Sequence, residues 1–349
     1  MGLAPGRAVL IPSNCIFIQF FTNGKSIDNM QNKKIVILAT GGTIAGKAGS
    51  ASDNIGYAAA QVGVKQLVEA IPALAAADNL VLEQIAQIDS KDMSFAVWAQ
   101  LASKVRHFLA RSDVAGLVIT HGTDTLEETA YFLHATLDPD KPVILTCAMR
   151  PATSLVPDGP QNFMDAVALA RWPGVRGVSV VCAGVIHSAV DVQKVHTYQL
   201  NAFSSGDAGA LGYIEENRPR LLRSWPVPQE IRPLAAIETI AKLSLKQLWP
   251  WVEIVMNHAG ANGKVVDALV AQGVQGLVLA GTGNGTVHHV LEASLIAAQA
   301  SGVRVVRASR CPNGVVLTKP DDMFEDSDGL SPVKARVALI LDLMATQSS

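Results

Sequence analysis

The chain has 349 residues, roughly twice the length of a typical single domain. Hydrophobic residues make up 49% of it and charged residues 17%, which excludes a disordered chain and a solvated coiled coil. Its 28 Lys and Arg and 30 Asp and Glu leave a net charge of -2, which offers no electrostatic footprint for nucleic acid or an anionic membrane surface. No uninterrupted apolar run reaches the ~18 residues of a membrane-spanning helix. We therefore expect a compact globular protein that binds a small neutral or zwitterionic molecule.

Residues 1–32 form a segment of their own, with a short apolar stretch near the start. Pro12, Ser13 and Asn14 interrupt that stretch, and no small-x-small cleavage site follows Phe21. Met30 stands where an ordinary cytoplasmic protein could begin. We expect an N-terminal extension, which need not be ordered, on a cytoplasmic protein. The alternative is an export signal and a periplasmic protein.

From residue 35 onward, short β-branched runs alternate with longer amphipathic stretches, which is typical of parallel strands joined by crossover helices. We predict two α/β domains with mainly parallel sheets, a larger one over 33–216 and a smaller one over 251–349. A proline-rich linker over 217–250, with a short helix at 239–247, would join them. The predicted strands of the first domain are 35–39, 116–120, 143–146 and 178–183, and its helices include 62–71, 94–109 and 162–171. The α/β alternation of the second domain runs over 252–256, 265–272, 276–280, 287–300 and 303–308, with a closing helix at 333–343.

The most clearly marked helix begins at Thr125. Thr125 and Glu128 form a T-x-x-E capping box, in which the threonine side chain bonds to the backbone of the first helical turn. Leu126, Ala130 and Leu133 then fall on one face of the predicted helix. This pattern predicts both the start of the helix and the way in which it is capped.

Two predicted strands run into polar turns, and ligands of open α/β sheets lie beyond the carboxyl ends of strands. In the first turn, TGGTIAG at 40–46, Gly41 and Gly42 permit a tight turn that exposes the Thr43 hydroxyl near backbone N–H groups. The spacing alone is compatible with a structural turn, a phosphate cradle or a catalytic hydroxyl. Neither the Walker order nor the G-x-G-x-x-G order is present.

The second turn is THGTDT at 120–125. Asp124, near a helix N-terminus, could simply complement the helix dipole. Thr123, beside that carboxylate and opposite another strand-end threonine, is also what a hydroxyl-based acyl transfer requires. We interpret His121 in this turn as a packed, hydrogen-bonded residue and not as a general base.

No group of side chains has the spacing of a metal site. His288 and His289 point in different directions on a helix, and neither they nor His258 have a suitably spaced carboxylate partner. The cysteines lack a CxxC pair or a regular spacing, so we expect buried free thiols in a reducing compartment. The four are Cys15, Cys147, Cys182 and Cys311.

Four ordered segments together resemble the bacterial-type L-asparaginase/glutaminase family. They are TGGTIAG at 40–46, IDSKDM at 88–93, THGTDTLEETAYFL at 120–133 and AMRPATSLVPDGPQN at 148–162. The resemblance runs from about Lys33 to the C-terminus. It implies a two-domain α/β amidohydrolase of asparagine catabolism, which converts L-asparagine and water to L-aspartate and ammonia, with glutaminase as a side activity. It also implies no metal or cofactor, and a homotetramer built as a dimer of dimers, in which a partner's second domain completes each active site.

The resemblance also implies roles for individual residues. Thr43 matches the family's nucleophile, and Tyr57 matches the tyrosine that closes over the substrate. Thr123 and Asp124 match the Thr-Asp pair of the second motif. Lys194 in DVQK matches the lysine that completes a Thr-Asp-Lys relay.

The substrate-binding set implied by the resemblance consists of Ser90, Asp124, Thr123 and Asp89, with Ser90 and Asp124 holding the α-carboxylate and α-ammonium groups. Elementary chemistry supports the catalytic roles, because a threonine hydroxyl is a poor nucleophile unless a neighbour takes its proton. Lys194, if partly desolvated beside Thr123, is the candidate acceptor, with Asp124 orienting the array. Thr43 would attack the amide carbon, release ammonia and pass through an acyl-enzyme that water cleaves.

The sequence departs from the family pattern in the second domain. Gly260 stands where the family commonly has Asn or Ser, the loop at 318–328 is short, and Lys319 stands about where a substrate-binding glutamate is expected. These departures leave the preference for asparagine or glutamine open.

Two alternatives belong to other function classes, and a third is a variant within the amidohydrolase class. A nucleotide-binding enzyme is disfavoured by the missing phosphate fingerprint. A non-enzymatic amino-acid binder would keep Ser90 and Asp124 without needing Thr43. A transamidase acting on tRNA-bound glutamate conflicts with the near-neutral charge.

Overall fold

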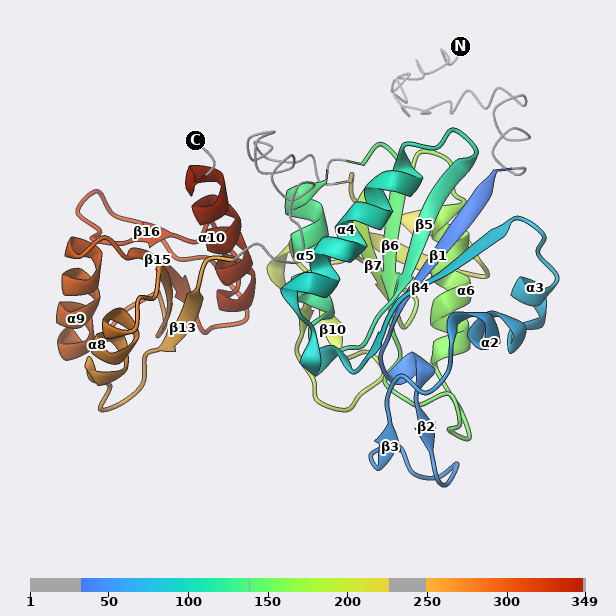
Figure 1. The fold of residues 1–349 in the computed structure, drawn as a ribbon, viewed down its shortest axis with the longest axis horizontal. Helices are drawn as coiled ribbons and strands as arrows, with labels where there is room; N and C mark the ends of the chain where they lie inside the picture. Colours follow the sequence, from blue (N-terminus) through green and yellow to red (C-terminus); the bar gives the residue numbers. More distant parts are fainter. Residues whose placement is uncertain (1–32, 138, 226–248, 348–349) are drawn as a thin grey trace, which may run out of the picture.

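The computed structural model describes residues 33–137, 139–225 and 249–347. These residues form a larger N-terminal and a smaller C-terminal α/β domain, as the sequence predicts (Figure 1). The expectations for residues 1–32 and for a helix at 239–247 lie outside the described residues. None of the described helices is both long and apolar enough to cross a bilayer.

The N-terminal domain is built on one eight-stranded sheet with the order β12-β11-β8-β7-β6-β5-β1-β4. Strands β4, β1, β5, β6 and β7 run parallel, and β8, β11 and β12 continue the sheet in antiparallel pairs. The strands are β1 (Lys34–Gly41), β4 (Leu80–Ile88), β5 (Val114–Thr120), β6 (Pro142–Thr146), β7 (Gly177–Cys182), β8 (Val185–Ser188), β11 (Gly212–Glu215) and β12 (Arg218–Leu221).

The four predicted strands are all present in this eight-stranded sheet, but the sequence alone does not identify its other four. Strand β4 lies at the sheet edge with only Ile85 fully buried, so it lacks the continuous apolar run of a central parallel strand. Strands β8, β11 and β12 are four residues each, too short for a clear periodicity. Strand β12 pairs with β11 inside the span 217–250 that was expected to be a linker.

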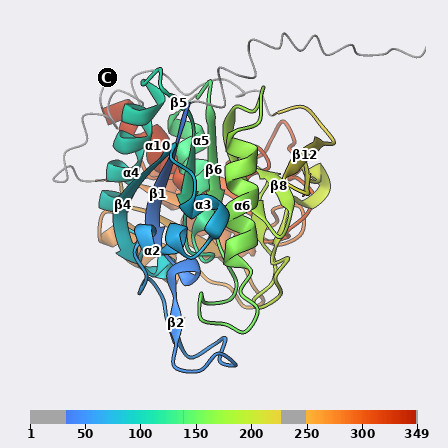
Figure 2. The ribbon, with the colours of Figure 1, turned by 90° about the vertical axis from the view of Figure 1, so that its right-hand side faces the viewer.

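Helices cover both faces of this sheet, because alternate residues of a strand point to opposite sides. In β1, Val36 and Leu38 join the core beneath α4 and α5, whereas Ile35 and Ile37 join the core beneath α2 and α6. Figure 2 shows α2, α3 and α6 on one face of the sheet. The helices are α2 (Val64–Glu69), α3 (Pro72–Ala75), α4 (Phe95–Leu109), α5 (Leu126–Thr136) and α6 (Gly159–Ala170).

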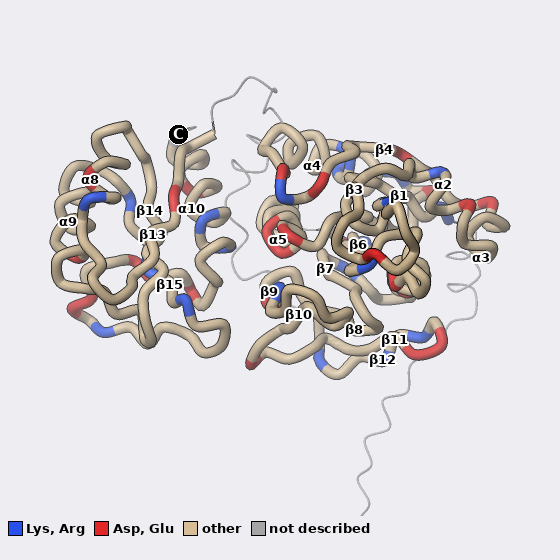
Figure 3. The backbone as a smooth tube through the Cα atoms, turned by 90° about the horizontal axis from the view of Figure 1, so that it is seen from below, with Lys and Arg blue, Asp and Glu red and all other residues tan. Residues whose placement is uncertain are grey.

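The C-terminal domain has a parallel four-stranded sheet with the order β13-β14-β15-β16. Helices α8 and α9 pack on one face, and the closing helix α10 packs on β13 and β14 and also against α5 of the N-terminal domain. Its elements are β13 (Val252–Met256), α8 (Lys264–Ala271), β14 (Gly276–Gly281), α9 (His289–Ala300), β15 (Arg304–Ser309), β16 (Glu325–Asp326) and α10 (Pro332–Gln347). Figure 3 shows basic and acidic residues distributed over both domains.

The helix predicted to start at Thr125 is α5, but the predicted capping box is wrong. Thr125 is the N-cap residue, yet its side chain makes no capping hydrogen bond. Its hydroxyl instead donates to the carbonyl oxygen of Ser90 at 2.8 Å. The side chain of Glu128 is mostly buried, and this burial raises its pKa to about 7. A contact between segments 35 residues apart has replaced the local cap.

Candidate active site

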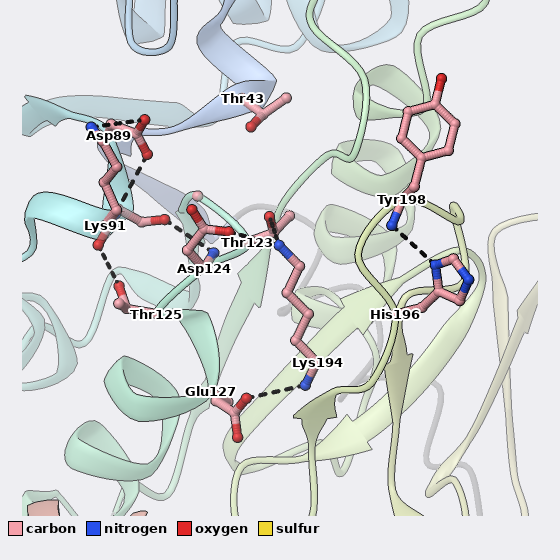
Figure 4. A network of polar contacts seen from close by, with 12 residues as sticks. Thr43, Asp89, Lys91, Thr123, Asp124, Thr125, Glu127, Lys194, His196 and Tyr198 are labelled. Carbon is pink, nitrogen blue, oxygen red and sulfur yellow. Dashed lines mark hydrogen bonds and ion pairs between the residues drawn. The ribbon is translucent and has the colours of Figure 1, made fainter. Parts of the chain in front are cut away.

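Three turns at the carboxyl ends of adjacent strands β4, β1 and β5 press against one another. A methyl group on Gly42 would lie 2.4 Å from the main chain of Gly122, and one on Gly122 would lie 2.4 Å from Ser90 Oγ. Only hydrogen fits at these positions, and the backbone at Gly42 has a φ of 83°. The close packing brings Thr43 and Thr123, which follow neighbouring parallel strands, to the same edge of the sheet (Figure 4), and it places Ser90 against Gly122 of the second turn.

We expect Gly42→Ala to destabilise the protein by about 3 kcal/mol or more, because the methyl group forces the first and second turns apart in a left-handed backbone. Denaturant unfolding of the purified variant measures this loss. Gly49→Ala is the matched control, since nothing lies within 4 Å of a methyl group built there. Equal stability of the two variants would show that the turns are not in such close contact.

Thr43 begins a short 3-10 helix, Thr43–Ala45, directly after β1. It is buried, and its Oγ lies 2.7 Å from the hydroxyl of Tyr57. Tyr57 belongs to a small hairpin, β2 (Lys47–Ala48) and β3 (Tyr57–Ala58), in which Tyr57 is the partner of Ala48. This hairpin brings the predicted closing tyrosine back to the predicted nucleophile.

Lys194 connects the two polar residues of the second turn. Its Nζ donates to Thr123 Oγ at 2.8 Å and contacts Asp124 Oδ1 at 2.7 Å (Figure 4). The lysine side chain is 19% exposed, whereas that of Asp124 is 50% exposed. The predicted Thr-Asp-Lys residues are therefore together, and the carboxylate remains open to a ligand.

Lys194 lies on β9 (Gln193–Lys194), which pairs with β10 (Phe203–Ser204). Its backbone N–H donates to Glu127 Oε1 at 3.1 Å. Burial raises the pKa of Glu127, and the charge of Lys334 acts in the opposite direction. The sequence reading did not identify Glu127 or Lys334, because no short motif links residues that meet from three separate segments.

The two predicted substrate-binding residues after β4 are placed differently. Ser90 is buried, and its Oγ accepts a hydrogen bond from the backbone N–H of Asp124 at 3.1 Å. The Asp89 carboxylate instead lies 3.3 Å from Lys91 Nζ, and it also accepts from the Lys91 backbone N–H at 3.4 Å. Ser90 is thus bonded to the second turn. Asp89 instead forms an ion pair with the exposed Lys91 at the rim of the site (Figure 4).

His121 is fully buried below the second turn, as expected of a packed residue. Trp98 Nε1 donates to the hydroxyl of Thr129 at 2.9 Å, and this hydroxyl donates to His121 Nε2 at 2.9 Å. The protonated Nδ1 of His121 then donates to the carbonyl oxygen of Gly122 at 2.7 Å. This assignment satisfies every group in the chain with a neutral imidazole. Burial lowers the pKa of His121 to about 4. The chain therefore supports the Gly122 carbonyl, next to Thr123, without a charge.

The depressed pKa of His121 makes stability depend on pH. An unfolded histidine takes up a proton near pH 6.5, whereas the folded one does so near 4, so its stabilising contribution is complete above 6.5 and is lost as the pH falls towards 4. The unfolding free energy of the parent protein falls between pH 8 and pH 5. We expect this fall to be about 2 kcal/mol smaller in His121→Gln, because the titrating imidazole is absent. Denaturant titrations at both pH values measure it. Thr129→Val should keep the full pH dependence, since the imidazole remains buried; an unchanged slope in His121→Gln would contradict the argument.

His288 and the cysteines are candidate metal ligands or reactive groups by residue type, and their contacts are those of structural residues. His288 Nδ1 accepts from the backbone N–H of Val290 and caps α9. Among the residues that the structure describes, no three His, Cys, Asp or Glu side chains are grouped as a metal site would need. Cys147, Cys182 and Cys311 are free, and the first two lie buried with their sulfur atoms 3.8 Å apart. Cys311 is exposed, so the expectation of a buried thiol is wrong there, and Cys15 lies outside the described residues.

Gly260 and Lys319 are the second-domain residues that depart from the family pattern, and the structure describes both. Gly260 has a φ of 72°, a conformation that glycine adopts without strain. Lys319 lines a cavity of about 290 Å³ with Arg307 and Asp322, and all of its lining residues belong to the C-terminal domain. Asp322 accepts both from Arg307 and from the Lys319 backbone N–H.

The fold and this site together define an enzyme of the amidohydrolase class. The family model described as "Asparaginase, N-terminal" matches residues 34–226, and the model described as "Glutaminase/Asparaginase C-terminal domain" matches residues 251–349. The chain belongs to this asparaginase/glutaminase family, which confirms the resemblance seen in its motifs.

Individual relatives agree with the family models. L-asparaginase 2 of Escherichia coli (strain K12) is 41% identical over 320 residues, which cover 90% of this chain and 89% of that protein. A protein of Haemophilus influenzae named "Probable L-asparaginase periplasmic" is 40% identical, covering 94% of this chain and 93% of its own. The crystal structure of a probable cytoplasmic L-asparaginase from Campylobacter jejuni has a TM-score of 0.82 and 36% identity, and the match covers 90% of this chain and 98% of that one.

Proposed function

We propose that the protein hydrolyses L-asparagine to L-aspartate and ammonia through an acyl-enzyme on Thr43, with L-glutamine as a slower substrate. The observation that carries this proposal is the convergence of two threonine systems. Thr43 is bonded to Tyr57, and Thr123 is bonded to Lys194, in turns that touch at Gly42 and Gly122. The names of the relatives support the same substrate.

Each group at the site has a part in the reaction that fits its contacts. Thr43 Oγ attacks the side-chain amide carbon, and Tyr57, 2.7 Å away, is the hydroxyl through which its proton leaves. Lys194 contacts Thr123 and Asp124, so a proton exchanged between Lys194 and the substrate passes by way of Thr123. The proton that Thr43 gives up is delivered to the amide nitrogen, which leaves as ammonia when the C–N bond breaks. Water then attacks the ester, one of its protons returns to the Thr43 oxygen as the C–O bond breaks, and L-aspartate is released.

The substrate's charged ends match two polar groups of the site, the half-exposed Asp124 carboxylate and the hydroxyl of the buried Ser90. The Asp124 carboxylate is half exposed and can pair with an α-ammonium group. The Ser90 hydroxyl accepts from the backbone N–H of Asp124, which leaves its hydrogen free for an α-carboxylate. Ser90 and Asp124 come from two turns joined by this hydrogen bond, so together they can hold both charged ends of an amino acid whose side-chain amide faces the threonines.

Ammonia release from L-asparagine by the purified protein tests the proposal directly. We expect turnover with asparagine, and a lower kcat/KM with glutamine. A thermal shift on adding asparagine without any ammonia would identify a non-enzymatic binder instead. A shift produced by a nucleotide and not by asparagine would favour the nucleotide-binding alternative.

We also propose that the protein acts as a homotetramer, a dimer of dimers, in the cytoplasm. The names of the relatives include both a cytoplasmic and a periplasmic protein. The two buried thiols 3.8 Å apart favour the cytoplasm, because such a pair remains reduced there. Light scattering should report four times the mass of the chain, and cell fractionation should report the compartment.

A further inference from the structure

We propose that Lys334, on helix α10 of the C-terminal domain, is a positioning residue that aims Lys194 at Thr123 from across the domain interface. This inference rests on the catalytic role proposed for Lys194. Lys334 itself does not touch the reacting groups. It acts on the main chain of the segment that leads into Lys194.

The ammonium group of Lys334 is bound to the chain just before the predicted catalytic lysine. Its side chain is completely buried, and Nζ donates to the carbonyl oxygens of Val190, at 2.7 Å, and Val192. Strand β8 has ended at Ser188, and β9 begins only at Gln193. Lys334 therefore fixes a connection that no sheet pairing holds, two residues before Lys194.

Glu127 on α5 holds the same segment through a backbone N–H, whereas Lys334 holds it through carbonyl oxygens. Its carboxylate accepts from the backbone N–H of Lys194, and its charge faces that of Lys334. Carbonyls at 190 and 192 and the N–H at 194 are thus bound from two helices that pack on each other. The backbone of the segment is held on both sides, and only the Lys194 side chain is left to extend towards Thr123.

Stability does not explain a lysine in this position. Burial lowers the pKa of Lys334 to about 8, against the opposing charges of Glu127 and Asp191. The nearby His187 has a pKa lowered to about 4, mainly by burial and then by the charge of Lys334. Burying such a charge is unfavourable, and replacing a whole buried ion pair by apolar side chains of similar volume is often neutral or stabilising. The contacts made by Lys334 instead serve the placement of the 190–194 segment.

Lys334→Met tests this role, because it keeps the length and packing of the side chain and removes its donors. We expect kcat for asparagine to fall by about 10- to 100-fold with KM changed by less than about threefold, since a shift of about 1 Å at a catalytic group has effects of this size. Arg336→Met is the matched control. Arg336 lies on the same helix and stacks over Phe95, but it donates to Val252 in its own domain. The Arg336→Met variant should be less stable than the parent protein but should keep the parental kcat.

A double-mutant cycle shows whether Lys334 acts through Lys194. In the Lys194→Met background, adding Lys334→Met should lower kcat by no more than about twofold, whereas independent structural effects would multiply. If Lys334→Met does not yield folded protein, Lys334→Gln, which retains an N–H donor, replaces it in the same cycle. Circular dichroism at the assay temperature confirms that each rate refers to folded enzyme.

The outcomes separate this inference from the proposed function. Parental kcat in Lys194→Met overturns both the role of Lys194 and the positioning role of Lys334. If Lys194→Met loses activity, the proposed role of Lys194 stands. In that case a parental kcat in Lys334→Met, or effects that multiply in the cycle, overturns the positioning role of Lys334 alone. A fall in kcat that Arg336→Met shares would assign the effect to the interface as a whole.

Discussion

Thr43→Ala should lower kcat for asparagine by about three to four orders of magnitude while the protein remains folded. Removing the hydroxyl removes the atom that forms the acyl-enzyme. The hydroxyl of the second proposed catalytic threonine, Thr123, is bonded to Lys194 and lies on a different turn, so it does not replace the missing one. Steady-state ammonia release and a mass spectrum of the quenched reaction measure the two consequences, the lost rate and the missing ester.

The fold should survive this change because Thr43 contributes only its contact with Tyr57 at 2.7 Å and little buried apolar volume. Thr43→Ser is the appropriate control, since it keeps the nucleophilic oxygen and should retain measurable turnover. Tyr57→Phe, which keeps the ring in place, should be slower than the parent but faster than Thr43→Ala. Ammonia release by Thr43→Ala at close to the parental rate would remove the proposed nucleophile.

Lys194→Met should reduce kcat by about a thousandfold, with a smaller effect on KM. The amine contacts both Thr123 and Asp124, at 2.8 and 2.7 Å, so its loss removes the proton exchange with Thr123 and leaves the carboxylate without this cation. The backbone contact with Glu127 is retained in the variant, because it involves the main chain only. Measurement of kcat and KM for asparagine over a range of pH values tests the prediction.

Lys91→Met provides the comparison for charge at the rim of the site. Lys91 is paired with Asp89 and Asp92 and is 60% exposed, so its removal should change kcat by no more than about twofold. Similar losses in Lys91→Met and Lys194→Met would indicate a general electrostatic effect of positive charge. A large loss in Lys194→Met alone identifies the contact with Thr123 as the cause.

Elements in the interior could be predicted from sequence because burial on both faces leaves a continuous apolar run. Residues 116–120 are predicted as a strand, and β5 (Val114–Thr120), which lies between β1 and β6, is buried at every residue. Strand β4 was not predicted, since its Glu83, Gln84 and Gln87 lie at a sheet edge where the apolar requirement is weaker. The helix start at Thr125 was correct, but the hydroxyl's partner was not local.

The sequence by itself determined the α/β alternation, the order of the two domains and the residues at the strand ends, because each depends on spacing within a few residues. Contacts between distant segments were decided only by the tertiary structure. It paired Asp89 with Lys91, put Ser90 against Asp124, and brought Glu127 and Lys334 to the chain around Lys194. The physical reason is that a hydrogen bond or a buried charge depends on which groups meet in space. Segments more than a hundred residues apart meet only when helices and strands have packed.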